Sequence, residues 1–153
     1  ASTGHPQISG DIIVFTSGLL KETGGLWAIN KRTGDILWTK QIISNYCTPR
    51  IQGEYVFVTE IPGKVYCLEL STGKEVWQIN LGQEIFNGQP LYIEGRLIVN
   101  LLRRSIAIID LKTLTYRIIE VSKRYLLAGP KTDQKLIFIG AFDECLYALD
   151  LIK

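Results

Sequence analysis

Residues 26–38 read LWAINKRTGDILW, and residues 65–77 repeat the same pattern as VYCLELSTGKEVW. A third, degraded copy, IAIIDLKTLTYRI, occupies residues 106–118, and a fourth begins at residue 146 with LYALDLIK. The copies start at intervals of about 40 residues, a period typical of repeats in which each unit forms one β-propeller blade. The repeat therefore predicts an all-β propeller.

A second marker keeps the same period. The chain has prolines at Pro6, Pro49, Pro90 and Pro130, again about 40 residues apart. Each is followed by a turn and then by a run rich in β-branched and aromatic residues, which indicates a strand. Two unrelated markers with one period indicate a genuine repeat.

Each unit is expected to form four short antiparallel strands. In the second unit we expect them at Cys47–Ile51, Tyr55–Thr59, Val65–Leu70 and Glu75–Ile79, because these runs are bounded by Gly and Pro turns. A two-sheet sandwich does not predict so regular a period, and solenoid repeats of about 20–29 residues are too short. The chain is predicted to be a single propeller segment, residues 1–153, with about four blades at roughly 4–43, 44–84, 85–124 and 125–153. The last blade is expected to lack its outer strand, which would leave an unpaired edge prone to association.

The repeated pattern Ala-x-Asp/Asn-x-x-Thr-Gly-x-x-x-Trp resembles the tryptophan-docking motif of the quinoprotein (PQQ-like) propeller repeat family. The resemblance covers essentially the whole chain, with two nearly complete copies and two weaker ones. In the third copy Leu114 stands for the turn glycine and Ile118 for the tryptophan. The positions that match the motif and that we predict to build the ring are Ala28, Asn30, Gly34, Trp38, Gly73, Trp77, Asp110, Ala148 and Asp150.

The resemblance implies that each docking tryptophan packs between adjacent blades and that the glycine turn belongs to the same girdle. These residues are expected to be structural and to perform no chemistry. The family contains dehydrogenases that use pyrroloquinoline quinone, an outer-membrane assembly lipoprotein and cofactor-free sensor or scaffold domains. Fold alone does not choose among them. The resemblance favours an extracytoplasmic location, periplasmic or secreted.

Composition excludes several other classes of function. The formal net charge of +2 is too small to indicate a nucleic-acid partner. No apolar stretch approaches the length of about 18 residues that a membrane span requires. Three cysteines, Cys47, Cys67 and Cys145, form no zinc pattern or disulfide framework and are expected to be buried in strands. The chain contains no Met, so we expect a processed or excised segment.

No residue is predicted to be catalytic, to bind a cofactor or to ligate a metal. A quinoprotein dehydrogenase is expected to carry a catalytic carboxylate, Ca²⁺ ligands and usually adjacent cysteines, and the acidic residues here are scattered. The single histidine, His5, lies near the N-terminus, and no nucleophile elbow or phosphate-binding loop is present.

One cluster of cations is a candidate interaction patch. Arg103 and Arg104 lie between the second and third strands of the third unit, and Lys123 and Arg124 follow its fourth strand. In an up-and-down blade these two connections emerge on the same rim. We therefore expect the four cations to lie close together and to contact an acidic partner or ligand by electrostatic complementarity.

These observations lead to three hypotheses. The first is a non-catalytic propeller scaffold for protein interaction or ligand sensing, within a larger protein and without a cofactor. The second is a fragment of a PQQ-dependent dehydrogenase whose active site lies in other blades. The third is that two copies associate to complete a ring, as a homo-oligomer.

Overall fold

The fold consists entirely of β-strands and the turns between them. The computed structural model describes residues 4–18, 24–43, 47–85, 89–126 and 129–150. These ranges contain fifteen strands and no helix, and within them no helix suitable for crossing a membrane was found. The last three residues of the fourth sequence copy lie outside the described ranges.

The strands form four antiparallel sheets, each built from one continuous stretch of chain. The first sheet contains β1 (Gln7–Ser9), β2 (Ile12–Ser17), β3 (Gly25–Asn30) and β4 (Ile36–Gln41). The second contains β5 (Arg50–Gln52), β6 (Tyr55–Glu60), β7 (Lys64–Glu69) and β8 (Glu75–Asn80). The third contains β9 (Leu91–Ile93), β10 (Arg96–Asn100), β11 (Ser105–Asp110) and β12 (Tyr116–Glu120). The fourth contains β13 (Lys131–Thr132), β14 (Leu136–Gly140) and β15 (Leu146–Asp150).

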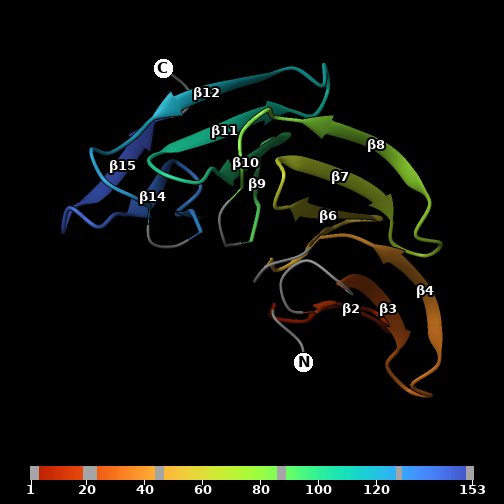
Figure 1. Ribbon diagram of the computed structural model, residues 1–153. Helices are drawn as coiled ribbons and strands as arrows, with labels where there is room; N and C mark the ends of the chain where they lie inside the picture. The colour runs from red at the N-terminus through yellow and green to blue at the C-terminus, as the bar shows by residue number, and fades with distance from the viewer. Residues whose placement is uncertain (1–3, 19–23, 44–46, 86–88, 127–128, 151–153) are drawn as a thin grey trace.

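The sheets are arranged as successive blades of a propeller. Each sheet is a simple meander, and the short first strands lie nearest the centre, where β1 contacts β5 and β5 contacts β9. Figure 1 shows the sheets fanning outward from this region, with β4, β8 and β12 on the outside. The predicted all-β propeller is confirmed. It is a partial propeller, because the described sheets form an open arc and the fourth has three described strands.

Three apolar clusters hold the arc together, one between each pair of neighbouring sheets. The middle blades are therefore covered on both faces, and the central residues of β7 and β11 are buried without interruption. In β15, at the end of the arc, exposed and half-buried side chains alternate instead. Burial on one face produces this alternation, since successive strand residues point to opposite faces.

The third blade departs from the first two in its outer strand. The pairing of β3 with β4 shifts register after Ala28, and that of β7 with β8 shifts after Cys67. The pairing of β11 with β12 continues without such a bulge and places Ile118 opposite Ala107. One residue of register reverses the face to which a side chain points. Ile118 is therefore on the face opposite to the one that the docking tryptophans use.

One expectation about the cysteines is wrong. Cys47 and Cys67 are buried, as expected, but Cys145 is exposed. It lies in the turn before β15, outside any strand, and its thiol contacts the carbonyl oxygen of Asp143.

Candidate functional site

Trp38 is the centre of the joint between the first and second blades. Its indole Nε1 donates a hydrogen bond to the carbonyl oxygen of Leu70 at 2.8 Å, and the side chain is only 8% exposed. The ring lies against Gly73: a Cβ built at Gly73 would be 2.5 Å from Cδ2 of Trp38. Because the turn also needs a positive φ of 71° at this position, glycine is required for two independent reasons.

A polar network supports the same joint. Lys40 on β4 forms an ion pair of 2.9 Å with Glu75 on β8, and its Nζ lies 4.7 Å from the centroid of the Tyr66 ring. The Tyr66 hydroxyl donates to the buried Glu60 carboxylate at 2.7 Å. Burial, and then this hydrogen bond and the negative charge of Glu60, hold the pKa of Tyr66 well above its ordinary value. The other Glu60 oxygen accepts from the backbone N–H of Ile43, so the network also fixes the connection between the blades.

The joint between the second and third blades has the same strand pairing as the first joint, but its side chains are larger. In the first blade, strand pairing aligns Val14, Ala28 and Trp38 in one row across the sheet. In the second blade the corresponding row is Phe57, Cys67 and Trp77.

The rings of Phe57 and Trp77 are 5.9 Å apart and tilted by 38°, a separation in the range of favourable aromatic pairs. Trp77 is nevertheless only half-buried, so its docking differs from that of Trp38.

Leu114 is incompatible with docking of Trp77 as close as that of Trp38. It occupies the turn position that corresponds to Gly73 and has a φ of 55°. Since a Cβ at Gly73 would collide with the Trp38 ring, a leucine at the corresponding position prevents Trp77 from approaching its own turn equally closely. No acceptor for Trp77 Nε1 is found among the described residues, whereas Trp38 Nε1 bonds the next blade.

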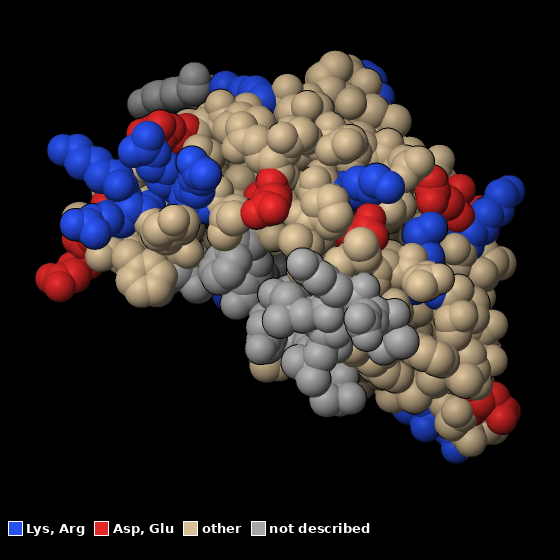
Figure 2. Space-filling view, viewed as in Figure 1, with Lys and Arg blue, Asp and Glu red and all other residues tan. Residues whose placement is uncertain are grey.

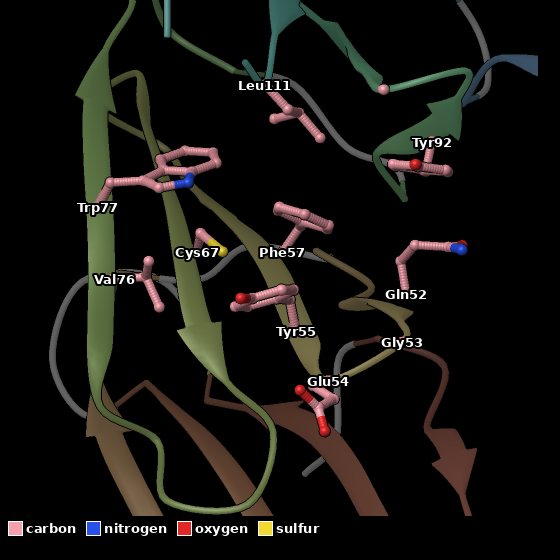
Figure 3. A pocket seen from close by; sticks show the side chains of 11 residues that line it. Gln52, Gly53, Glu54, Tyr55, Phe57, Cys67, Val76, Trp77, Tyr92 and Leu111 are labelled. Carbon is pink, nitrogen blue, oxygen red and sulfur yellow. The ribbon is translucent and has the colours of Figure 1, made fainter. Parts of the chain in front are cut away.

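A cavity of about 590 Å³ lies beside Trp77, between the second and third blades. Figure 3 shows its walls: Phe57 and Trp77 of the second blade lie beside one another, and Leu111 and Tyr92 of the third blade lie across from them. Burial raises the pKa of the Cys67 thiol at the cavity wall to about 12, which keeps the thiol protonated and unreactive at neutral pH. The lining residues are Gln52, Gly53, Glu54, Tyr55, Phe57, Cys67, Val76, Trp77, Tyr92, Gly95 and Leu111.

The other predicted repeat positions lie in turns or near the end of the arc. The Asn30 side-chain oxygen accepts from the backbone N–H groups of Arg32 and Thr33, and Asp110 does the same for Lys112 and Thr113. The bonds from Thr113 and Lys112 lower the pKa of the Asp110 carboxyl. Each side chain thereby holds the turn between the third and fourth strands of its blade.

The remaining repeat positions differ in burial. Ala28 is fully buried, whereas Ala148 and Asp150 on β15 are exposed. At Gly34 an added Cβ would meet nothing within 4 Å among the described residues, in contrast to Gly73. Among the described residues, the turn of the first blade thus lacks the contact that Gly73 makes with Trp38.

The structure brings the two halves of the basic patch together. The Arg104 carbonyl oxygen accepts from the N–H of Val121 at 2.8 Å, and the Arg103 carbonyl oxygen accepts from Leu126 at 2.8 Å. Lys123 and Arg124 lie in the chain between Val121 and Leu126, the two residues whose N–H groups donate these bonds. Arg104 also lies 3.5 Å from the Glu120 carboxylate, which offsets part of the positive charge. Figure 2 shows a group of Lys and Arg side chains at the end of the molecule where β12 and β15 lie in Figure 1.

No group of three or more His, Cys, Asp or Glu side chains positioned to hold a metal ion was found within the described ranges. The cavity was not predicted from the sequence. Its aromatic walls, Tyr55, Phe57 and Tyr92, read as ordinary strand residues. The available signal was Leu114, where the repeat loses its turn glycine.

Comparison with known proteins gives one family and several similar structures. Over residues 28–116 the chain matches the PQQ-type family model described as outer membrane protein assembly factor BamB. The protein of that name from Xanthomonas campestris pv. campestris is 26% identical over 98 residues, which are 63% of this chain and 23% of the relative. The match therefore covers less than a quarter of the length of this curated relative.

Three solved structures illustrate the fold. BamB from Moraxella catarrhalis superposes with a TM-score of 0.74 at 19% identity, over 95% of this chain and 44% of that one. The computationally designed protein Ika4 gives 0.81 at 15% identity, over 98% and 91%. The quinohemoprotein alcohol dehydrogenase from Comamonas testosteroni gives 0.72 at 16% identity, over 92% and 29%. At these identities the likeness is one of fold.

Proposed function

We propose that this chain, which belongs to the PQQ-like repeat family of β-propellers, is a non-catalytic scaffold segment that docks other proteins. We further propose that residues 1–153 act as one segment of a larger ring. The match to a model described as an outer-membrane assembly factor supports both proposals and an extracytoplasmic location.

The observation that carries the proposal is the uncovered outer face of the first blade. Strand pairing aligns Ile8, Ile13, Ile29 and Ile36 in one row across all four strands, on the face opposite to Val14 and the first core cluster. None of the four is buried, and Ile8 and Ile36 are 62% and 60% exposed. A continuous apolar face of this kind marks an interaction surface.

The turn glycine of the first blade indicates which kind of partner covers this face. Between the first two blades, the turn of Gly73 receives Trp38 from the preceding blade. The corresponding turn glycine of the first blade, Gly34, is open among the described residues. We infer that another blade of this type docks there, from the same protein or from a second copy.

Sedimentation velocity over a range of concentrations tests this inference on the chain as it stands. We expect concentration-dependent association, and we expect Ile8→Lys with Ile36→Lys to weaken it, because both side chains are already exposed and tolerate a charge in the monomer. Ile118→Lys, a substitution at an exposed position on β12 of the third blade, is the matched control. A chain that stays monomeric at all concentrations contradicts pairing of two copies.

The basic patch is the proposed contact for an acidic partner. Its four cations come from two connections that are hydrogen-bonded to one another, which supports a shared surface. Charge reversal at Arg103 and Arg104 is expected to slow association with the partner and to reduce its salt dependence. The experiment is a pull-down from the native source followed by binding kinetics. Unchanged binding of every partner rules out the patch as the contact.

The alternative function is a segment of a quinoprotein dehydrogenase, because solved enzymes of that type share the fold. Because this alternative places the active site in other blades, titration with excess pyrroloquinoline quinone and Ca²⁺ has to be made on the longer protein that contains them. Binding of the quinone there favours the dehydrogenase, and failure to bind contradicts it.

A further inference from the structure

We infer that the cavity between the second and third blades binds a small organic cation of the alkylated ammonium class. The inference goes beyond the proposed docking of proteins by naming a small-molecule site and a ligand chemistry. It does not depend on the uncovered outer faces, because both walls of the cavity belong to blades within this chain.

The cavity follows from a specific difference between two equivalent joints. At the first joint the tryptophan ring fills the space above its turn glycine and bonds the next blade through Leu70. At the second joint Leu114 replaces that glycine, and Trp77 becomes a wall of an open space. Both tryptophans occupy the same register position, each paired with a residue of the third strand of its blade. The cavity is therefore a local difference between two otherwise equivalent blades.

Aromatic side chains dominate the walls of this space. Tyr55 and Phe57 come from β6, Trp77 from β8 and Tyr92 from β9, so four rings converge from three strands and two blades. The negative face of an aromatic ring attracts a cation, and cages of several rings are suited to alkylated ammonium groups, which carry charge on an apolar surface. The volume of about 590 Å³ lies within the usual range for a small-molecule site.

The charge of the lining points to the same ligand. Glu54 is its single carboxylate, and none of the described lining residues is Lys or Arg. No ion pair of Glu54 is found within the described part of the chain. Glu54 is exposed, and Figure 3 shows its carboxylate pointing away from the rings. The aromatic faces, with no Lys or Arg among the described lining residues, are therefore what favours a cation over an anion here.

The first test compares two ligands of one shape. The full chain is titrated with choline and with 3,3-dimethyl-1-butanol, its uncharged counterpart, and binding is followed by tryptophan fluorescence and by calorimetry. Choline is expected to bind about tenfold more tightly, the ratio that a cation–π contribution of the usual size predicts. Equal binding of both compounds, or binding of neither, overturns the inference.

The second test closes the cavity. Leu114→Gly removes the side chain that keeps Trp77 from its turn, so we expect Trp77 to dock as Trp38 does and choline binding to be lost. The same variant is expected to raise the melting temperature, because glycine relieves the positive φ at this position. A stable variant that binds choline like the wild type contradicts the inference.

The third test removes one ring. Tyr92→Leu is expected to weaken choline binding severalfold and to change binding of the neutral analogue less, because only the cation uses the negative face of the ring. Tyr116→Leu makes the same change on an exposed position of β12, outside the cavity lining, and is expected to have no effect. Equal effects of the two variants overturn the assignment to this cavity. A chain that binds no choline but still self-associates contradicts only the cavity and leaves the scaffold proposal standing.

Discussion

The α-carbon of Gly73 lies against the indole ring of Trp38, so closely that a methyl group there would be 2.5 Å from Cδ2. Gly34 has a similar φ, 79° against 71°, in the corresponding turn of the first blade, with nothing within 4 Å among the described residues. Substitution of the two glycines therefore distinguishes the cost of a side chain at positive φ from the cost of a steric clash with Trp38.

Substitution of this pair tests the docking of Trp38. Gly34→Ala is expected to cost about 1 kcal/mol, the cost of a side chain at positive φ. Gly73→Ala carries the same cost and in addition displaces a packed tryptophan, for a total of about 3 kcal/mol. Urea unfolding of both variants measures the difference, and equal losses contradict the contact.

The two docking tryptophans are expected to respond differently to loss of the indole nitrogen. Trp38→Phe leaves the Leu70 carbonyl without its donor and is expected to cost about 1–3 kcal/mol beyond the loss of ring volume. Trp77→Phe removes no hydrogen bond to a described residue, so its cost is expected to be that of ring volume alone. Denaturant unfolding of the two variants checks this, and an equal or larger loss for Trp77→Phe is evidence against the asymmetry.

Tyr66 makes stability sensitive to alkaline pH. Its folded-state pKa lies above the unfolded value of about 10, so the native state holds the proton more tightly. The resulting stabilisation is fully present below about pH 10 and is lost as the pH rises through the folded-state pKa.

Tyr66→Phe is expected to flatten this alkaline decline. At neutral pH the variant also deprives Glu60 of a hydrogen bond, at a cost of about 1–3 kcal/mol. Melting temperatures between pH 7 and 11 measure both effects. A decline of the same steepness in wild type and variant shows that another group is responsible.

The three thiols are expected to react at different rates. Cys145 is exposed, whereas Cys47 and Cys67 are buried, and burial raises the pKa of Cys67 to about 12. A maleimide at pH 7 should therefore modify one thiol quickly, and the other two should react only in denaturant. Peptide mapping identifies the modified residue. Rapid modification of Cys67 in the folded chain contradicts its burial.

Much of the fold was predictable because its determinants are local. The turn residues, such as Asn30 and Gly34, act within a few residues of themselves, and the strands between them follow from β-branched and aromatic runs. The repeat then places equivalent strands in equivalent positions. The exposure of Cys145 was not predictable in this way, because a turn residue shows no burial pattern.

The cavity was less accessible to prediction, since it depends on contact between segments far apart in the sequence. The loss of glycine at Leu114 is visible in the chain, but its effect on Trp77 requires the distance between Gly73 and Trp38 at the other joint. The face of Ile118 likewise depends on whether a bulge forms between β11 and β12. Neither pairing register nor packing between blades can be read from residue types alone.

Because each described sheet is formed by one continuous stretch of chain, a single blade can be duplicated as a unit. Duplication of about 40 residues adds a blade without dividing an existing sheet, and it copies the docking residues with it. Each copy is then free to change alone. A contrast such as that between the closed joint at Trp38 and the open one at Trp77 can arise in this way without altering the other blades.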